Sequence, residues 1–237
     1  MEAWQEELLA LAVESSQGFV RVFELLLKAA QAQDFEFVAY GFQAPLPASA
    51  PRVTLLNNYP AAWQLAYREK GYLAIDPVVR HARESTMPLG WSRKERSMAP
   101  AFWDEAGSHG IRFGWSQPFR DVNGSCGILS LARSAQALST AELQEKQLKL
   151  QWLAQTGHMM LSRHIQANEC SCVAGLTARE RDVMKWTVDG KSAQDIADIL
   201  GVSTSAVNLH ISNVTRKLGV SNKTAAAVKA LTLGLLA

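Results

Sequence analysis

The stretch that most constrains the fold is residues 176–218, which predicts three helices joined by very short turns. The first begins with a capping box, T-x-x-E, at Thr177. It ends at Gly190, where a left-handed residue is needed. The second helix covers 192–200 and the third covers 203–218, with a tight turn between them. This spacing predicts a helix-turn-helix unit.

The third predicted helix has two chemically different faces. An inward apolar stripe recurs at helical spacing: Val207, Ile211, Val214 and Leu218. The other face offers small hydrogen-bonding side chains near its start and cations near its end, a division suited to base edges and phosphates. We expect double-stranded DNA to be contacted by Thr204, Ser205, Asn208, His210, Ser212, Thr215, Arg216 and Lys217. Asn208 and Ser212 are expected over base edges, and Lys217 on a phosphate.

Positive charge is concentrated at this end of the chain. From Gly175 onward, eight Lys or Arg residues face five acidic residues, a net charge of +3. The whole chain carries +2, so the remainder is slightly negative. An ordinary three-helix interaction domain is the alternative, but the helix spacing and the charge together favour DNA.

A set of positions through this segment carries a family resemblance. They are Leu176-Thr-x-Arg-Glu180, Trp186, Gly190-Lys191, Ile196-Ala197, Leu200, Val207-Asn208-x-His210 and Lys217-Leu218-Gly219. Together they resemble the LuxR-type helix-turn-helix over nearly the whole C-terminal third. Met184 departs from the family's usual Leu, but its flexible side chain fills nearly the same volume.

Length and composition favour two domains in a soluble, cytoplasmic protein. The 237 residues are long for one domain, and 48% of them are hydrophobic. We expect a ligand-binding domain at 1–167, a linker at 168–175 and the DNA-binding domain at 176–237. No window approaches the roughly 18 uninterrupted apolar residues of a membrane helix, and the N-terminus does not resemble a signal peptide.

Cysteine usage fits a reducing compartment. Cys126, Cys170 and Cys172 are odd in number, and the last two are too close in sequence to favour pairing with each other. A metal site built from these two and His164 would lack a fourth ligand at the usual spacing. We therefore expect neither a metal nor a cofactor.

The first domain is predicted to be an α/β/α sandwich, which with the all-helical C-terminal domain gives an α+β protein. Predicted helices cover 4–33 (broken near 15–18), about 60–70, 76–83, 99–109 and 139–165, the last opened by a capping box at Ser139-x-x-Glu142. Predicted strands cover 35–42, 52–57, 87–91, 114–120 and 126–132, with Asn123-Gly124 as a hairpin signal. This order predicts an antiparallel sheet with helices on both faces and room for a small ligand under one helical layer.

Aromatic residues and one carboxylate gather in the middle of this domain. Tyr59, Trp63 and Tyr67 are spaced by four, which predicts one shared helix face. Such a row is either a core stripe or a wall that offers indole and phenol donors. Asp76 precedes Pro77, so it is either a helix cap or a ligand-binding carboxylate.

The same residues carry a second resemblance. The run N-Y-P-x-x-W-x-x-x-Y from Asn58, then Tyr72, Asp76-Pro77, Trp91, Gly114 and Leu129-Ser130, resembles the autoinducer-binding domain of LuxR-type quorum-sensing receptors. The two resemblances together span nearly the whole chain. Trp63 and Tyr67 match the family pattern at positions where relatives that answer plant compounds tend to depart from it.

This resemblance implies an N-acyl-homoserine lactone as the ligand. Trp63 would donate to the lactone carbonyl, and Asp76 would accept from the ligand's amide N–H. Tyr59 and Ser130 would donate to the amide carbonyl, although Ser130 by itself could be an incidental strand serine. Tyr67 and Trp91 would wall the lactone and the adjoining chain. Trp115 could narrow the pocket or belong to the core.

The function implied is a quorum-sensing regulator that binds a palindromic promoter site as a homodimer, with RNA polymerase as a further partner. The long helix from Ser139, and a final helix with Val228, Leu231 and Leu235 in a stripe, are candidate dimer surfaces. A response regulator is a rival, but Gln43-Ala-Pro45 follows the first strand where a receiver needs acidic residues. An enzyme acting on lactones is the other rival, and no nucleophile–base pair or metal cluster assembles for it.

Overall fold

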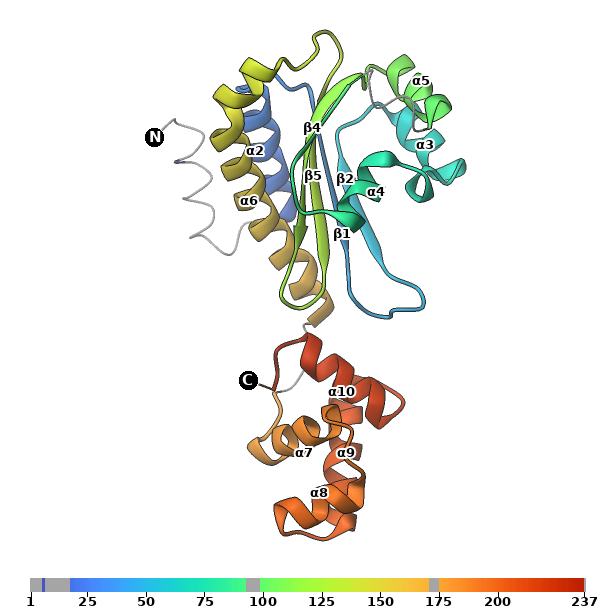
Figure 1. The fold of residues 1–237 in the computed structure, drawn as a ribbon, viewed down its shortest axis with the longest axis vertical. Coiled ribbons are helices and arrows are strands. Elements are labelled where there is room, and N and C mark those ends of the chain that lie inside the picture. The colour runs from blue at the N-terminus through green and yellow to red at the C-terminus, as the bar shows by residue number, and fades with distance from the viewer. Residues whose placement is uncertain (1–5, 7–17, 93–98, 171–174, 237) are drawn as a thin grey trace. The chain divides into compact units, whose positions relative to one another are not determined.

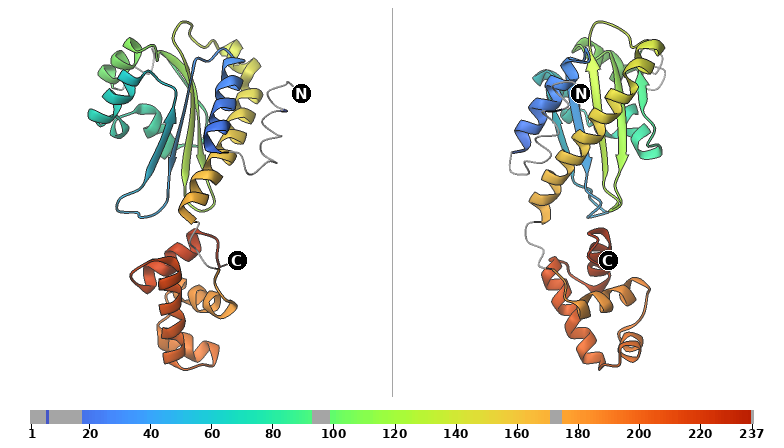
Figure 2. Two further views of the ribbon diagram at one scale, coloured as in Figure 1. Left: turned by 180° about the vertical axis from the view of Figure 1, so that it is seen from behind. Right: turned by 90° about the vertical axis from the view of Figure 1, so that its left-hand side faces the viewer.

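The fold comes from a computed structural model, which describes residues 6, 18–92, 99–170 and 175–236. It contains two compact units (Figures 1 and 2). The first includes most residues up to Ala167, and the second includes Asn168–Ala237. Each unit has a hydrophobic core of its own, as expected for a chain long enough to form two domains.

An antiparallel sheet of five strands forms the centre of the first unit. Its strand order is β2-β1-β5-β4-β3. The strands are β1 (Phe37–Gln43), β2 (Val53–Asn57), β3 (Leu89–Trp91), β4 (Phe113–Arg120) and β5 (Cys126–Arg133). Each lies within two residues of its predicted span at both ends, because aromatic and branched residues with turn signals on either side define a strand well.

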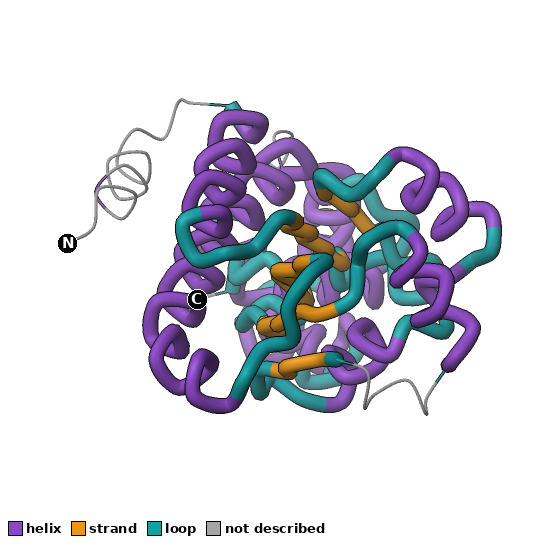
Figure 3. Tube along the Cα trace, turned by 90° about the horizontal axis from the view of Figure 1, so that it is seen from above, coloured by secondary structure: helices purple, strands orange, loops and turns teal. Residues whose placement is uncertain are grey.

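Helices cover both faces of this sheet (Figures 1 and 3). On one face lie α2 (Phe19–Gln31) and α6 (Thr140–Cys170). On the other lie α3 (Ala61–Glu69), the short 3-10 helix η1 (Tyr72–Ala74), α4 (Pro77–Glu84) and α5 (Pro100–Ser108). The predicted sandwich, and with it the α+β class, is confirmed.

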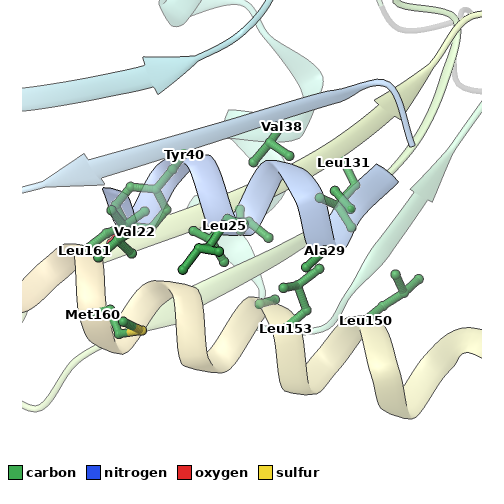
Figure 4. Close-up of a cluster of buried hydrophobic side chains, with 14 of the residues drawn as sticks. Val22, Leu25, Ala29, Val38, Tyr40, Leu131, Leu150, Leu153, Met160 and Leu161 are labelled. Atoms are coloured by element: carbon green, nitrogen blue, oxygen red, sulfur yellow. The ribbon is translucent and has the colours of Figure 1, made fainter. Parts of the chain in front are cut away.

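Strand alternation separates two cores within this unit. In β1, Val38 and Tyr40 are buried in the larger core against α2 and α6 (Figure 4), and Phe42 belongs to the same core. Ala39 and Gly41, between them, face the α3–α5 layer instead. Because side chains alternate with a period of two, a slip of one residue would exchange the two faces.

Gly18 and the β4–β5 loop lie at two of the predicted boundaries. Gly18 is extended and precedes α2, as the predicted break requires; apart from Glu6, the predicted helix before it lies outside the described residues. The β4–β5 loop spans Asp121–Ser125, longer than a two-residue turn, and Gly124 in it has φ +82°.

The start of α6 follows the predicted cap, but the glutamate of the predicted box has other partners. Ser139 Oγ accepts from the Glu142 N–H at 3.1 Å. The Glu142 carboxylate binds Arg133 Nη2 at 2.7 Å and Lys146 Nζ at 2.9 Å. The Arg133 guanidinium, helped by Lys146, holds the pKa of Glu142 at about 2. The cap of α6 is thereby tied to the end of β5.

The far end of α6 was predicted too early. The helix continues to Cys170 rather than ending near 165, so the first residues of the predicted linker 168–175 are helical. Residues 171–174, with Cys172 among them, lie outside the described part of the chain.

The second unit is entirely helical where it is described. Its helices are α7 (Ala178–Val188), α8 (Ala193–Leu200), α9 (Thr204–Leu218) and α10 (Lys223–Thr232). The capping box at Thr177 is present, and Gly190 has the left-handed conformation expected of it. Met184 is fully buried in the shared core. The predicted helix-turn-helix is therefore confirmed.

Among the helices in the described ranges, none is long and apolar enough to cross a membrane.

Candidate functional site

A cavity of about 560 Å³ lies between the sheet and the α3–α5 layer. Its volume falls within the roughly 300–1,000 Å³ typical of small-molecule sites. Strands β1, β2 and β5 line it from one side, and α3, α4 and α5 from the other. The fold brings all six side chains predicted to bind the ligand to this one cavity: Tyr59, Trp63, Tyr67, Asp76, Trp91 and Ser130.

Asp76 is at once a helix cap and part of the cavity wall. Its Oδ1 accepts from the Val78 N–H at 2.8 Å, which caps α4. Its Oδ2 accepts from the Tyr67 hydroxyl at 2.9 Å. Burial raises the pKa of the Asp76 carboxyl, and the hydrogen bonds from Tyr67 and from the backbone of Val78 and Val79 oppose that rise. Asp76 can therefore cap the helix and still be available to bind a ligand.

The two phenols beside Asp76 are held in their protonated form. Burial, followed by the nearby Asp76 charge, raises the pKa of both Tyr59 and Tyr67 above the ordinary value. A phenol that stays protonated can donate a hydrogen bond at every physiological pH. Tyr67 directs its proton to Asp76, whereas the Tyr59 hydroxyl has no partner among the described residues.

Trp63 lies at the centre of an aromatic cluster at one end of the cavity. It is 3% exposed. Its ring contacts those of Tyr67, Tyr72, Phe102 and His109, with centroids 5.6–5.8 Å apart. Such contacts fix the orientation of the indole. Within the described part of the chain its N–H has no acceptor, so this donor at the cavity is free for a ligand. The buried N–H of Trp103, which also lines the cavity, has no partner among the described residues either.

The predicted shared helix face for three aromatics is only partly correct. Trp63 and Tyr67 lie on α3, one turn apart. Tyr59 precedes the helix, because Pro60 occupies the N-cap position and α3 starts at Ala61. Tyr59 still lines the cavity, and its ring packs on Phe37 of β1 with centroids 5.6 Å apart.

A chain of hydrogen bonds links Trp91 to Ser130 across the sheet. The Trp91 indole N–H donates to Ser116 Oγ at 2.9 Å, and Ser116 Oγ lies 2.8 Å from Ser130 Oγ. The Trp91 ring lies close to β4 at Gly114, since a Cβ on Gly114 would be 2.1 Å from it. Gly114 is therefore required for the position of Trp91, as the glycine of a strand often is where another group approaches closely.

Sequence reasoning missed Ser116, which is fully buried and completes this chain. It alternates with Trp115 along β4, so the two residues face opposite sides of the sheet. Trp115 belongs to the larger core with α2 and α6 and does not line the cavity. Of the two readings of Trp115, the core reading is correct, and the alternation itself could have decided it.

Successive rows of paired residues give the cavity floor a polar part and an apolar part. Asn57, Ala39 and Ser130 are aligned across β2, β1 and β5, and all line the cavity. Two residues further along the strands, Leu55, Gly41 and Ile128 form the next row. The floor thus passes from hydrogen-bonding groups to hydrocarbon within about 7 Å, two residues of antiparallel strand.

The outward face of α9 is the second candidate site. Ser205, Asn208, Ser212 and Arg216 are exposed, as predicted, and Arg216 Nη2 donates to Asn213 Oδ1 at 2.8 Å. The other predicted contacts, Thr204, His210 and Thr215, are half-buried along its flanks. Thr204 Oγ1 donates to Gln194 Oε1 of α8 at 2.8 Å, and Thr215 Oγ1 donates to the Ser212 carbonyl. Sequence reasoning overlooked Leu209, which lies on the exposed side of the helix.

Lys217, predicted to hold a phosphate, has partners inside the second unit. Its Nζ lies 2.7 Å from Glu180 Oε2 and 3.3 Å from the Gly175 carbonyl. Glu180 is buried, which opposes its ionisation, but Lys217 and the hydrogen bonds from Thr177 hold its pKa below the usual range. This ammonium therefore stabilises a buried carboxylate inside the unit, and its contact with a DNA phosphate stays a prediction.

Across the described ranges, no group of three or more His, Cys, Asp or Glu side chains could hold a metal ion.

Comparison with known proteins gives matches to two family models. Residues 20–161 match the autoinducer binding domain, and residues 174–230 match the LuxR family of bacterial regulatory proteins. The first match contains all six predicted cavity residues. The second contains all four helices of the second unit except the last two residues of α10.

Individual relatives extend the likeness to the whole chain. The transcriptional activator protein AnoR of Acinetobacter nosocomialis is 40% identical over 241 residues and covers 100% of both chains. A crystal structure of Escherichia coli SdiA has a TM-score of 0.85 at 30% identity, over 97% of this chain and 96% of that one. The N-acylhomoserine lactone dependent LuxR family factor CepR2 of Burkholderia cenocepacia has a TM-score of 0.62 at 26% identity, over 69% and 98%.

Proposed function

The chain belongs to the LuxR family of quorum-sensing transcription regulators, and from this premise we propose that its signal is an N-acyl-homoserine lactone. Members of the family join an autoinducer-binding domain to a helix-turn-helix and are not enzymes. The match over residues 20–161 also excludes a receiver domain in the first unit. Ligand binding is assigned to 1–167 and DNA binding to 176–237, joined through 168–175.

The observation that carries this proposal is the polar end of the cavity. It pairs a half-buried carboxylate, Asp76, with two unpaired donors, the Tyr59 hydroxyl and the Trp63 indole N–H. An N-acyl-homoserine lactone offers the complementary groups: one amide N–H, one amide carbonyl and one lactone carbonyl. Asp76 accepts from the amide N–H, Tyr59 donates to the amide carbonyl, and Trp63 donates to the lactone carbonyl. Each of these three side-chain groups would then have a hydrogen-bond partner in the ligand.

Ser130 supplies the second donor to the amide carbonyl. The Trp91 N–H donates to Ser116 Oγ, and in the proposed arrangement Ser116 in turn donates its proton to Ser130 Oγ at 2.8 Å. That leaves the Ser130 proton directed elsewhere, and the cavity is on its accessible side. Because each hydroxyl has a single proton, this order makes Trp91 both a wall of the cavity and the group that orients the Ser130 hydroxyl.

The apolar end of the cavity suits the acyl chain. Leu55, Gly41 and Ile128 line it beyond the row that contains Ser130. A hydrocarbon tail lying there gains about 0.8 kcal/mol for each buried CH₂. Tyr67 and Trp91 enclose the lactone and the first part of the tail. CepR2, which is named as dependent on an N-acylhomoserine lactone, supports the same class of ligand.

The lactone-bound chain acts as a homodimer on a palindromic DNA site. In α10, Val228 and Leu231 are 45% and 57% exposed, whereas Leu235 packs on the core of the unit. In α6, Leu148 and Met159 are likewise exposed. These apolar surfaces are the proposed contacts between copies. A twofold dimer would place two α9 helices in successive major grooves, next to RNA polymerase in the bacterial cytoplasm.

Co-purification tests the proposal directly. The full chain is expressed in cells supplied with a panel of N-acyl-homoserine lactones, purified, denatured and examined by mass spectrometry. One lactone is expected at about one molecule per chain in wild type, and much less in Trp63→Phe, which keeps an aromatic ring but loses the donor. A protein that folds and never retains any lactone would contradict the proposed ligand.

A further inference from the structure

Leu209 is an apolar side chain among polar ones on the outward face of α9. Leu209 is 61% exposed, and the buried residues Val207, Val214 and Leu218 define the opposite side of the helix. With about 100° between successive residues of a helix, Leu209 shares its face with Ser205, Ser212 and Arg216, which lie four residues before, three after and seven after it. All three of those neighbours are polar.

The chemistry of the DNA major groove identifies what a leucine on this face would contact. Base edges there present hydrogen-bond donors and acceptors, together with one apolar group, the C5-methyl of thymine. Serine and arginine side chains can use the donors and acceptors. Leucine can use only the methyl, and it gains by removing both apolar groups from water.

The other exposed leucines in the described part of the chain lack that setting. Leu55 and Leu148 belong to the first unit. Leu65 on α3 is 50% exposed but belongs to the first unit, and Leu231 on α10 lies in the stripe assigned above to dimerisation. A single exposed leucine is common on any protein surface. Leu209 differs because it lies among exposed polar residues on α9, the third helix of the helix-turn-helix. This helix carries a net positive charge.

We propose that Leu209 determines specificity by packing on the methyl group of a thymine in each half-site of the operator. The proposal rests on the DNA-binding function proposed above. Ser205, Ser212 and Arg216 then hold the helix by hydrogen bonds and charge, while Leu209 distinguishes thymine from the other bases at one position.

The test replaces thymine by uracil, which removes the methyl group and leaves the base pair intact. An operator is first selected from random double-stranded DNA with the full-length chain and its lactone. Each thymine is then replaced singly by uracil, and affinity is measured for wild type and Leu209→Ala. At one thymine per half-site, wild type should lose about fourfold in affinity, the factor that about 0.8 kcal/mol per buried methylene-sized group corresponds to.

Leu209→Ala should bind the uracil operator as wild type does and show no difference between thymine and uracil at that position. Leu65→Ala is the matched control and should keep the full thymine preference. If Leu209→Ala keeps the preference at every thymine, or weakens the thymine and uracil operators alike, the inference is overturned. Failure to select any operator would instead contradict the DNA-binding function, so the two failures are distinguishable. Unfolding curves identical to wild type would exclude a folding defect in the variant.

Discussion

At the scale of single residues, Asp76 combines a structural role with the proposed binding role. As the N-cap of α4 it accepts the Val78 N–H, and as part of the cavity wall it accepts the Tyr67 hydroxyl. Asparagine caps helices about as well as aspartate. The charge can therefore be removed while the cap is kept.

Asp76→Asn is expected to weaken lactone binding by about 1.5–3 kcal/mol, the range for a hydrogen bond to a charged group. The variant should stay folded, because its side-chain carbonyl can still accept from Val78. Calorimetric titration of the lactone into both proteins measures the loss. Asp76→Ala is the comparison, since it removes the cap as well and should also lower the melting temperature. An Asn variant with wild-type affinity would show that Asp76 only caps the helix.

The raised pKa of Asp76 predicts a pH dependence with a definite sign. Burial raises the pKa of folded Asp76 above its pKa in the unfolded chain. The free energy of unfolding therefore decreases as the pH rises from the unfolded pKa to the folded pKa, because the buried carboxyl is harder to ionise. The ligand amide N–H binds the ionised form more strongly than the protonated one. Lactone affinity of wild type should therefore fall as the pH is lowered through the folded pKa, while that of Asp76→Asn stays flat. Parallel curves for the two proteins would remove Asp76 from the binding step.

At the scale of elements, the pair of Lys217 and Glu180 joins α9 to the start of α7. Glu180 is 3% exposed and forms the capping box with Thr177, while Lys217 Nζ lies 2.7 Å from its Oε2. The pKa of Glu180 is held low. Stability from this group is therefore present above the unfolded glutamate pKa and is lost as the pH falls through the folded value.

Lys217→Met should lower the free energy of unfolding of the second unit by about 1–3 kcal/mol, the cost of leaving a buried polar group without its partner. The slope of DNA affinity against salt concentration should change little, because this ammonium is already paired. Arg216→Met serves as the contrast: it should reduce that slope by about one phosphate contact and leave stability nearly unchanged. The opposite pattern, with Lys217 controlling the salt slope, would show that Lys217 contacts a DNA phosphate.

Local sequence signals predicted most of the elements and left long-range partners undetermined. The capping box at Thr177 and the strand alternation act within a few residues, so their patterns are visible in the chain. The partner of Lys217 lies 37 residues away, and no periodicity shows that an apparently outward lysine bends back to Glu180. Ser116 was missed for a similar reason, since its role depends on Trp91 and Ser130 on neighbouring strands.

The roles of the cavity residues were predicted from the family resemblance and not from local sequence signals. Spacing alone left Tyr59, Trp63 and Asp76 between core, cap and ligand-binding roles, and the family resemblance decided among them. Asp76 shows why spacing could not: the same carboxylate caps α4 and lines the cavity. A single pattern of residues can serve both purposes.

At the scale of the whole molecule, lactone binding in the first unit is proposed to control operator binding by the second. A lactone that binds only the folded first unit stabilises it by mass action, by about 2.7 kcal/mol at a concentration one hundred times its Kd. Dimerisation through α6 and α10 would convert that stabilisation into operator binding, because two half-sites must be engaged together.

The most direct test of this account is operator affinity measured by fluorescence anisotropy as a function of lactone concentration. The full-length chain should bind its selected operator tightly only when the co-purifying lactone is present. Trp63→Phe should need at least about tenfold more lactone for the same response, as expected from losing one buried hydrogen bond of about 1.4 kcal/mol. Operator binding of equal strength with and without every lactone tested, in wild type and variant alike, would contradict the account.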